Sequence, residues 1–251
     1  MGFVKSSDAV ATRGSTLVLP SVSVGNVPQL AVDLLVNTLQ AARIGILDSA
    51  QAIPVSGPSG FDHLPEQRLV PVEVYQSADG KWTIVQQRSP PLPGRHRAFA
   101  QELVEFIRQG EYARVLLLTS SDAALRPDAL IEGPQIRSLA VNWPDEELAA
   151  RLQELSLGPL GAASMAKEEE PLKQLHSAGA AKHLLRLLRD TDIPVVALVA
   201  LVNEGDNVPD AVRLASAANA LLEIVPGAEN WRPPQSWQWL SGPASPPSEL
   251  Y

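Results

Sequence analysis

Apolar residues recur along this chain with two different periods, and these periods predict strands and helices. The stretch 16–24 (TLVLPSVSV) is rich in β-branched residues and predicts a strand. From residue 29 to 43 the leucines fall on one face of a helix and the polar residues on the opposite face. The stretch 44–48 predicts a further strand. A strand–helix–strand order of this kind is typical of a parallel sheet.

The next part of the chain predicts a β-hairpin. The stretches 69–76 and 81–88 have strand composition and flank residues 77–80 (SADG), whose Asp-Gly pair favours a tight turn. In the first of these strands valines alternate with Glu73 and Tyr75, which predicts that only one of its faces is buried.

The remaining residues continue the alternation of strands and helices. In chain order we expect a helix ending at Gly110, a strand over 114–119, a helix after Asp145, a helix over 181–190, a strand over 193–202 and a helix over 208–224. The segment 156–180 has small residues, prolines and an acidic run, which predicts a mobile excursion. The pattern therefore predicts an α/β fold, a single three-layer domain over 1–240 with a mostly parallel central sheet flanked by helices, followed by a flexible tail over 241–251.

Composition restricts the partners and the compartment. The chain has 251 residues and a formal net charge of −8, which argues against a broad electrostatic contact with nucleic acid or an anionic membrane. It contains no cysteine, so disulfides, thiol nucleophiles and thiolate metal sites are excluded. No secretory signal is visible at the start, and the apolar run 193–202 is about half of the ~20 residues that a membrane helix needs. We expect a cytoplasmic and nuclear protein.

Two turns of similar sequence follow predicted strands, and each passes through Asn-Val-Pro into a helix. The residues concerned are Gly25, Asn26 and Val27 in the first turn and Glu204, Gly205, Asp206 and Asn207 in the second. The first turn could bind an anion at a helix N-terminus, and the acidic residues of the second could bind a metal through oxygen ligands. Turn formation and helix capping explain both groups better, so we expect structural or interface roles, with no metal and no cofactor.

No catalytic constellation stands out elsewhere. Residues 120–122 (SSD) follow a predicted strand, but no G-x-S-x-G elbow surrounds either serine, and turn chemistry accounts for them. The four histidines have no metal-ligand spacing, and neither G-x-G-x-x-G nor a Walker loop occurs. Arg88, Arg95 and Arg97 form a small basic group that we interpret as solvated or as the rim of an interface. We therefore expect no enzymatic activity.

The last part of the chain carries aromatic side chains and an apolar end. Trp231, Trp237 and Trp239 crowd into a segment whose prolines prevent a continuous helix, so we expect it to cross the body in extended form as a lid or an interface anchor. Leu250 and Tyr251 follow a stretch rich in serine and proline. Such an end is either frayed or fills a pocket on a partner, where each apolar side chain could contribute roughly 1.5–3 kcal/mol.

A set of stretches along the chain carries a family resemblance, and several of them are too long and too specific for chance similarity. They are 19–27 (LPSVSVGNV), 72–75 (VEVY), 87–89 (QRS), 202–211 (VNEGDNVPDA) and 231–237 (WRPPQSW). In this order they resemble the proteasome assembly chaperone family, whereas 156–180 shows little similarity. The resemblance implies an α/β sandwich around a central sheet. It also implies a non-enzymatic chaperone that pairs with proteasome assembly chaperone 1, binds the outer face of the proteasome α ring, promotes ring formation and prevents premature pairing of α rings.

The resemblance also assigns a role to the tail. In this family a C-terminal motif of a hydrophobic residue, a tyrosine and any residue enters pockets between neighbouring α subunits. Leu250 and Tyr251 match the first two positions, but no residue follows Tyr251. The resemblance therefore implies that Glu249, Leu250 and Tyr251 contact an α-subunit pocket, either with the carboxylate one position early or in a shifted register.

Two other classes of function stay open. An α/β enzyme whose sheet resembles that of a nucleoside phosphorylase would need a phosphate or nucleoside site near 25–26, 120–122 and 204–207. A general adaptor would use its tail on an unrelated groove. Ligand binding by the isolated chain would favour the enzyme, and partners unrelated to the proteasome would favour the adaptor.

Overall fold

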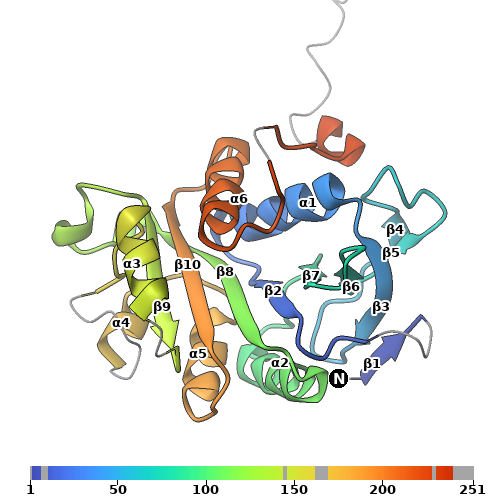
Figure 1. The fold of residues 1–251 in the computed structure, drawn as a ribbon, viewed down its shortest axis with the longest axis horizontal. Helices are drawn as coiled ribbons and strands as arrows, with labels where there is room; N and C mark the ends of the chain where they lie inside the picture. Colours follow the sequence, from blue (N-terminus) through green and yellow to red (C-terminus); the bar gives the residue numbers. More distant parts are fainter. Residues whose placement is uncertain (1, 7–10, 144–145, 162–168, 228–229, 240–251) are drawn as a thin grey trace, which may run out of the picture.

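The structure, a computed structural model, describes residues 2–6, 11–143, 146–161, 169–227 and 230–239. Its main sheet has eight strands in the order β1-β3-β6-β7-β2-β8-β10-β9 (Figure 1). Their bounds are β1 Gly2–Lys5, β2 Thr16–Pro20, β3 Ala42–Asp48, β6 Val72–Gln76, β7 Trp82–Gln87, β8 Arg114–Asp122, β9 Ile136–Val141 and β10 Val195–Val202. A separate small pair consists of β4 Gly57–Pro58 and β5 Arg68–Leu69. The helices are α1 Val27–Leu39, α2 His96–Gly110, α3 Glu146–Glu154, α4 Glu169–Lys173, α5 Ala181–Arg189 and α6 Val208–Leu222, with short 3-10 turns η1 Val24–Asn26, η2 Ala123–Leu125, η3 Asp128–Leu130 and η4 Gln235–Trp239.

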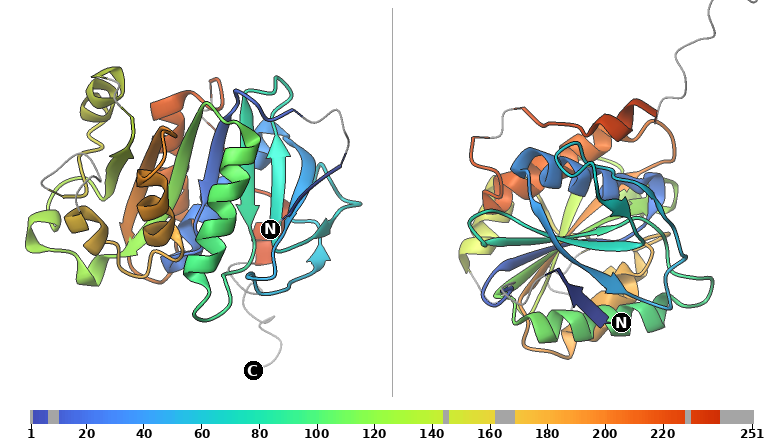
Figure 2. Two further views of the ribbon diagram at one scale, coloured as in Figure 1. Left: turned by 90° about the horizontal axis from the view of Figure 1, so that it is seen from below. Right: turned by 90° about the vertical axis from the view of Figure 1, so that its right-hand side faces the viewer.

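Helices cover both faces of the sheet, which confirms the expected three-layer α/β fold. α1 and α6 pack side by side on one face, and α2 and α5 pack on the other (Figures 1 and 2). Because successive residues of a strand point to opposite faces, Leu116 and Leu118 belong to the core beneath α1 and α6, while Val115 and Leu117 belong to the core beneath α2 and α5. Among the described residues no helix is long and apolar enough to cross a membrane.

The sheet is parallel at its centre and antiparallel toward both edges. β7, β2, β8 and β10 run parallel to one another. β9 pairs antiparallel with β10 at one edge, and β6, β3 and β1 add antiparallel pairings at the other. The predicted hairpin forms with Gln76 opposite Thr83, and a tight turn can join only antiparallel strands. The two strands predicted within 16–48, β2 and β3, belong to the same sheet, and β7 and β6 lie between them.

β8 and β10 form the centre of the core. All eight residues of β10 are buried, as expected for a strand covered by helices on both faces. β8 pairs with it in parallel as far as Asp122. The prediction of a turn at 120–122 was therefore wrong. Pairing with β10 prolongs the strand beyond its apolar run, and both Ser120 and Ser121 are buried in it.

The described parts of 156–180 pack on the body. Leu160 and Leu172 are buried in the core beneath α5, and the Leu160 N–H donates a hydrogen bond to the backbone oxygen of Ser138 in β9. These parts of the segment therefore pack on the folded body. The predicted mobility stays a prediction for 162–168, which lie outside the described residues.

Candidate functional site

The first of the two turns links β2 to α1 through two residues in the left-handed region. Gly25 has a φ of 66° and Asn26 a φ of 52°. A side chain at Gly25 would be strained by the positive φ, and it would also collide with the second turn. A Cβ on Gly25 would lie 2.3 Å from Asn207 Oδ1. The glycine therefore allows the two turns to touch, and Val27 begins α1 directly after them.

Asn207 organises the second turn from a buried position. Its Oδ1 accepts the Gly205 N–H at 3.1 Å, and its Nδ2 donates to Asn203 O at 2.9 Å and to Asp210 Oδ2 at 3.0 Å. Asp206 Oδ1 accepts the N–H of the first residue of α6 at 3.3 Å. These carboxylates thus stabilise the turn and the start of the helix. Within the described ranges, no group of three or more His, Cys, Asp or Glu side chains is placed to hold a metal.

The serines at the end of β8 fasten the strand to its surroundings. Ser120 Oγ donates to Val24 O at 2.7 Å and lies 2.8 Å from Ser23 Oγ, which also accepts the Ser120 N–H at 3.0 Å. Ser121 Oγ donates to His176 O at 3.1 Å. Both hydroxyl protons are thus directed at backbone carbonyls. The bonding links β8 to the first turn and to the loop before α5, which is a structural use of these serines.

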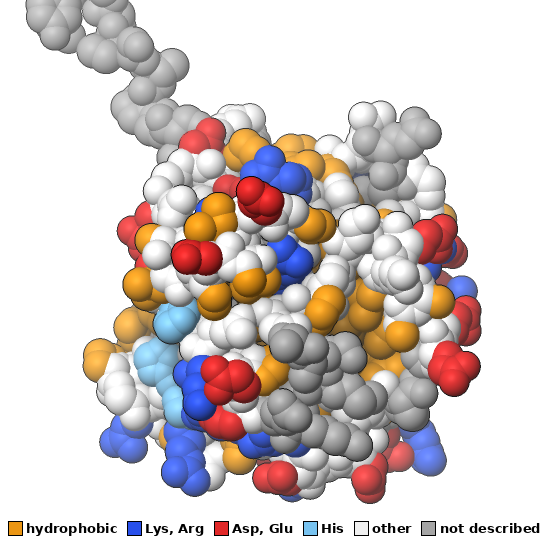
Figure 3. Space-filling model, turned by 90° about the vertical axis from the view of Figure 1, so that its left-hand side faces the viewer, with side chains coloured by type: hydrophobic (Ala, Val, Ile, Leu, Met, Phe, Trp, Pro, Cys, Tyr) orange, Lys and Arg blue, Asp and Glu red, His pale blue; other side chains and the backbone are white. Residues whose placement is uncertain are grey.

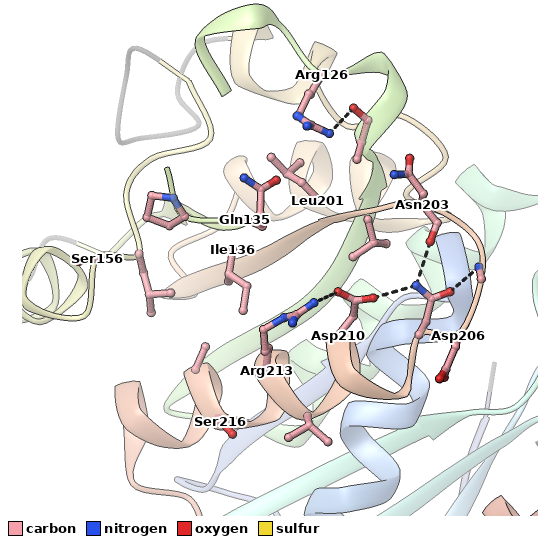
Figure 4. Close-up of a pocket in the computed structure, with 18 of the residues that line it drawn as sticks. Arg126, Gln135, Ile136, Ser156, Leu201, Asn203, Asp206, Asp210, Arg213 and Ser216 are labelled. Carbon is pink, nitrogen blue, oxygen red and sulfur yellow. Dashed lines mark hydrogen bonds and ion pairs between the residues drawn. The ribbon is translucent and has the colours of Figure 1, made fainter. Parts of the chain in front are cut away.

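An open cleft of about 940 Å³ lies beside the second turn (Figure 4). Leu201 of β10 and Ile136 of β9 contribute apolar surface, and exposed Glu204 lies at the cleft as well. Asp210 and Arg213 pair with each other on the α6 side (Figure 4). The segments in which an enzyme site was considered do meet at this edge, as the carboxyl ends of parallel strands must. Their polar groups, however, bond mainly to one another.

The described segment 230–239, which we call the C-terminal strap, crosses the outer side of the helices α6 and α1 (Figure 1). Trp231 Nε1 donates to Ser216 Oγ of α6 at 2.9 Å. The Arg232 N–H donates to Thr38 Oγ1 of α1 at 3.0 Å, and Asn37 Nδ2 donates to Arg232 O at 3.0 Å. The first half of the strap is therefore bonded to both helices.

The second half of the strap reaches the loop before β5. Trp237 packs against the core beneath α1, and its Nε1 donates to Asp33 Oδ2 at 3.2 Å. Ser236 Oγ donates to Gly60 O at 2.9 Å. These contacts agree with a lid, which was one of the two roles expected for the tryptophans; a role as interface anchors is untested. Trp239 ends the strap, and its side chain is outside the described part of the structure.

Beneath the strap lies a buried ion cluster of Asp33, Arg43, Glu73 and Arg88. The Arg88 guanidinium lies 2.8 Å from Asp33 Oδ1 and 3.1 Å from Glu73 Oε2, and Arg43 lies 3.2 Å from Glu73 Oε1. Gln86 Nε2 also donates to Asp33 Oδ1, at 2.6 Å. Side-chain exposure is only 12% for Arg88 and 4% for Glu73. Removing one member of such a group leaves a buried charge without its partner, at a cost of about 3–5 kcal/mol.

The surroundings keep Arg88 charged. Burial by itself would lower its pKa, but the neighbouring carboxylates of Asp33 and Glu73 prevail and raise the pKa above its ordinary value. The guanidinium also lies 4.9 Å from the centre of the Phe61 ring. Burial is the main reason why the pKa of the Tyr75 hydroxyl is raised, and the charge of Glu73 adds to it. Both side chains therefore hold their protons more tightly in this fold than they would in water.

This cluster corrects two expectations from the sequence. The interpretation of Arg88 as solvated was wrong, and so was the prediction of a single buried face for the strand with Glu73 and Tyr75. On the second face, Phe61 packs against Tyr75, and Arg43 and Arg88 pair with Glu73. Sequence periodicity does not register a cover that distant segments supply. A signal was nevertheless present, because the stretches 72–75, 87–89 and 231–237 that carry the family resemblance all meet here.

The tail residues named from the sequence cannot be placed. Glu249, Leu250 and Tyr251 lie outside the described residues, so the predicted contact with an α-subunit pocket stays a prediction. The strap is the last described segment before them, and it is bonded to α6, α1 and the Gly60 loop.

Comparisons with known proteins agree with the resemblance. The PAC2 family model matches residues 17–231. A Danio rerio relative named proteasome assembly chaperone 2 is 32% identical, covering 98% of this chain and 98% of its own length. A Nematostella vectensis relative of the same name is 35% identical, covering 84% of this chain and 90% of its own length.

Solved structures share the fold at lower identity. Pyrococcus furiosus PbaA, described as an archaeal homolog of proteasome-assembly chaperone, has a TM-score of 0.64 and 17% identity, covering 91% of this chain and 89% of that chain. PbaB from the same organism, described as an archaeal proteasome activator, has a TM-score of 0.60 and 16% identity, covering 88% of each chain. The matched range 17–231 contains both turns and the buried ion cluster. The chain therefore belongs to the PAC2 family, and relatives named proteasome assembly chaperone 2 match it over most of its length.

Proposed function

We propose that this chain is a non-enzymatic chaperone for assembly of the 20S proteasome. In this proposal it pairs with proteasome assembly chaperone 1, binds the outer face of the α ring, promotes ring formation and prevents premature pairing of α rings. The observation that carries the proposal is the similarity to the Danio rerio proteasome assembly chaperone 2 over 98% of both chains. We infer that the protein works in the cytoplasm and nucleus, without binding nucleic acid or membrane.

The chemistry of the strand ends supports a role in binding and not in catalysis. Ser120 and Ser121 donate their hydroxyl protons to backbone oxygens, and the side-chain amide of Asn207 forms hydrogen bonds within its own turn. Asp210 is engaged by Asn207 and Arg213. A nucleophile needs a neighbouring base and a free approach to the substrate. Because these side chains are already hydrogen-bonded within the protein, they stabilise the folded body, and in this proposal that body binds the partners.

The strap supports the proposed docking of the tail. In this proposal Glu249, Leu250 and Tyr251 enter a pocket between α subunits while the body contacts the ring surface. The strap precedes these residues in the chain and is bonded to α6 and α1, so the described part of the chain before the tail is attached to the body. A second tail from the partner chaperone would raise the effective concentration of each, so that the pair holds the ring more firmly than either tail alone.

The test is capture of α subunits by the co-expressed chaperone pair, measured by native mass spectrometry. We expect the wild type to capture them and Leu250→Ser with Tyr251→Ser to capture fewer. Pro246→Ser with Pro247→Ser is the matched control in the same tail, and it should leave capture unchanged.

The outcomes separate the parts of the proposal. Equal capture by the wild type and the Leu250/Tyr251 variant would contradict docking by the tail and assign binding to the body. Absence of capture in every form would contradict the chaperone function itself. Enrichment of partners unrelated to the proteasome would then point to an adaptor.

A further inference from the structure

A hollow of about 420 Å³ opens between the N-terminal ends of α2 and α5. His96 at the start of α2 and Lys182 and His183 in the first turn of α5 line it, together with Val22 and Gly179 from the loops beneath. It lies on the side where the parallel strands β2 and β8 end. Proteins with parallel α/β sheets commonly place ligand sites at this edge.

The loop before α5 is held firmly against those strand ends. Ser21 Oγ donates to Ala178 O at 3.0 Å and accepts the Ala181 N–H at 3.2 Å. Gly179 has a φ of 61° and approaches the loop after β2 so closely that a Cβ would lie 2.0 Å from Val22 O. Only glycine fits this approach. The side chains that line the hollow therefore stand on a preorganised base, which reduces the entropy lost when a ligand binds.

Positive charge gathers around this hollow, although the chain as a whole carries a formal charge of −8. Arg186, Arg97 and Lys182 are the Lys and Arg side chains that act on His183, and His96 is a further neighbour. Glu169 pairs with Arg186. Arg97 and Lys182 form no ion pair within the part of the chain that the structure describes. Figure 3 shows histidine side chains lying beside Lys and Arg side chains on this side of the molecule.

These basic residues oppose the usual charge preference of helix starts. A helix N-terminus carries a partial positive charge and favours acidic side chains. α3, α4 and α6 follow this preference with Glu146, Glu169 and Asp210 in their first turns. α2 and α5 have no acidic residue there. A cation at a helix start is unfavourable, and local conflicts of this kind are typical of functional sites.

We propose that this surface, which we call the cationic mouth (the cations Arg97 and Lys182 with the neighbouring His96 and His183), binds an acidic segment of a protein partner through its carboxylates. Such a segment would remove the conflict, because carboxylates accept hydrogen bonds from first-turn amides and neutralise the side chains at the same time. Lys182 of α5 lines the hollow, and exposed Arg97 lies next to the lining residue His96 in α2. Two cations on two helices match several carboxylates along a peptide better than one small anion. The overall negative charge of the chain disfavours nucleic acid.

The cationic mouth and the strap lie on different layers of the fold. α2 and α5 cover one face of the sheet, whereas the strap crosses α1 on the other (Figure 1). The inference is therefore independent of tail docking. Deletion of Leu250 and Tyr251 should leave binding of an acidic peptide unchanged, and a failure of one proposal does not imply failure of the other.

The test titrates the full chain into fluorescein-labelled octaglutamate and follows fluorescence anisotropy at about 0.15 M ionic strength. Arg97→Glu with Lys182→Glu should weaken binding by about tenfold or more, because two charge-assisted contacts become repulsive. The matched control is Arg13→Glu with Lys81→Glu, which alters net charge equally at two exposed positions away from the mouth. It should change affinity by no more than about twofold.

Several results would overturn the proposal. They are absence of octaglutamate binding by the wild type, equal binding of octaglutamine, and equal weakening by the two double variants. Stronger competition by inorganic phosphate than by unlabelled octaglutamate would identify a small-anion site instead. Stronger competition by a single-stranded oligonucleotide would assign the mouth to nucleic acid. Thermal unfolding of each variant checks its fold. Lys182→Gln is a milder change, and it should weaken octaglutamate binding less than Arg97→Glu with Lys182→Glu does.

Discussion

Arg88 and Arg97 lie close together in the sequence and in opposite environments in the fold. Arg88 is 12% exposed and lies between two carboxylates beneath the strap. Arg97 is exposed at the cationic mouth and has no carboxylate within ion-pair distance among the described residues. The difference shows that a charge acquires its role from what covers it. Matched, buried charges specify the fold, whereas unmatched, exposed ones are available to a partner.

The strongest test of this comparison replaces each arginine by methionine. Arg88→Met leaves Asp33 and Glu73 buried without their shared partner and should lower the free energy of unfolding by about 3–5 kcal/mol. Arg97→Met, its matched control, should stay within about 0.5 kcal/mol of the wild type. Urea unfolding of both variants gives the two values. Similar small losses at both positions would mean that the buried ion cluster does not stabilise the fold.

The next test asks whether the strap is fixed by the same cluster. Trp237→Phe removes the indole donor to Asp33 and should cost about 1.5–3 kcal/mol, because the acceptor is charged. Trp231→Phe removes a donor to the neutral hydroxyl of Ser216 and should cost about 0.5–1.5 kcal/mol. Urea unfolding again supplies the comparison. If Trp231→Phe proves the more costly change, the strap is anchored mainly on α6.

At the cationic mouth a charge change should stabilise the protein, whereas the changes at the buried ion cluster and the strap should destabilise it. Lys182→Glu places an acidic residue in the first turn of α5 and should raise the free energy of unfolding by about 0.3–1 kcal/mol. The same variant should bind octaglutamate more weakly. Thermal unfolding and anisotropy measure the two effects, with Arg13→Glu as the control. If Lys182→Glu is less stable than the wild type and binds octaglutamate equally well, the proposal that these cations bind an acidic partner is contradicted.

The smallest effect concerns the protonation of His183. Partial burial, and then the charges of Arg186, His96, Arg97 and Lys182, lower its pKa below the ordinary value of about 6.5. The unfolded chain therefore binds more protons near that pH, so the stability contribution is present above about pH 6.5 and is lost as the pH falls. Lys182→Gln should raise the His183 midpoint in an NMR titration, while Arg13→Gln should not. An unchanged midpoint in Lys182→Gln would show that the two groups do not interact.

Local structure was predictable from the sequence where it depends on neighbouring residues. The hairpin at 77–80, the helix ending at Gly110 and the buried run before 202 all formed as expected, because residue period and turn chemistry act over a few neighbours. The strand β9 escaped prediction. Its place at the sheet edge depends on pairing with β10, which is distant in the sequence.

The candidate site was predictable only in part. Both turns were singled out from the sequence, and their direct contact at Gly25 and Asn207 became visible only when β2, β8 and β10 were placed side by side. The cationic mouth was missed for a similar reason. His96 and Lys182 are far apart in the chain and converge because α2 and α5 pack on the same face of the sheet.

By itself the sequence determined the α/β class, most helices and strands, and the stretches that resemble the family, since these depend on the order and period of residues. Only the tertiary structure decided the strand order, the burial of Glu73 and Arg88, and the meeting of cations from two helices. Which surfaces cover a strand, and which charges face each other, depend on contacts between distant segments. The free energy of burying a charge follows from those contacts and not from its neighbours along the chain.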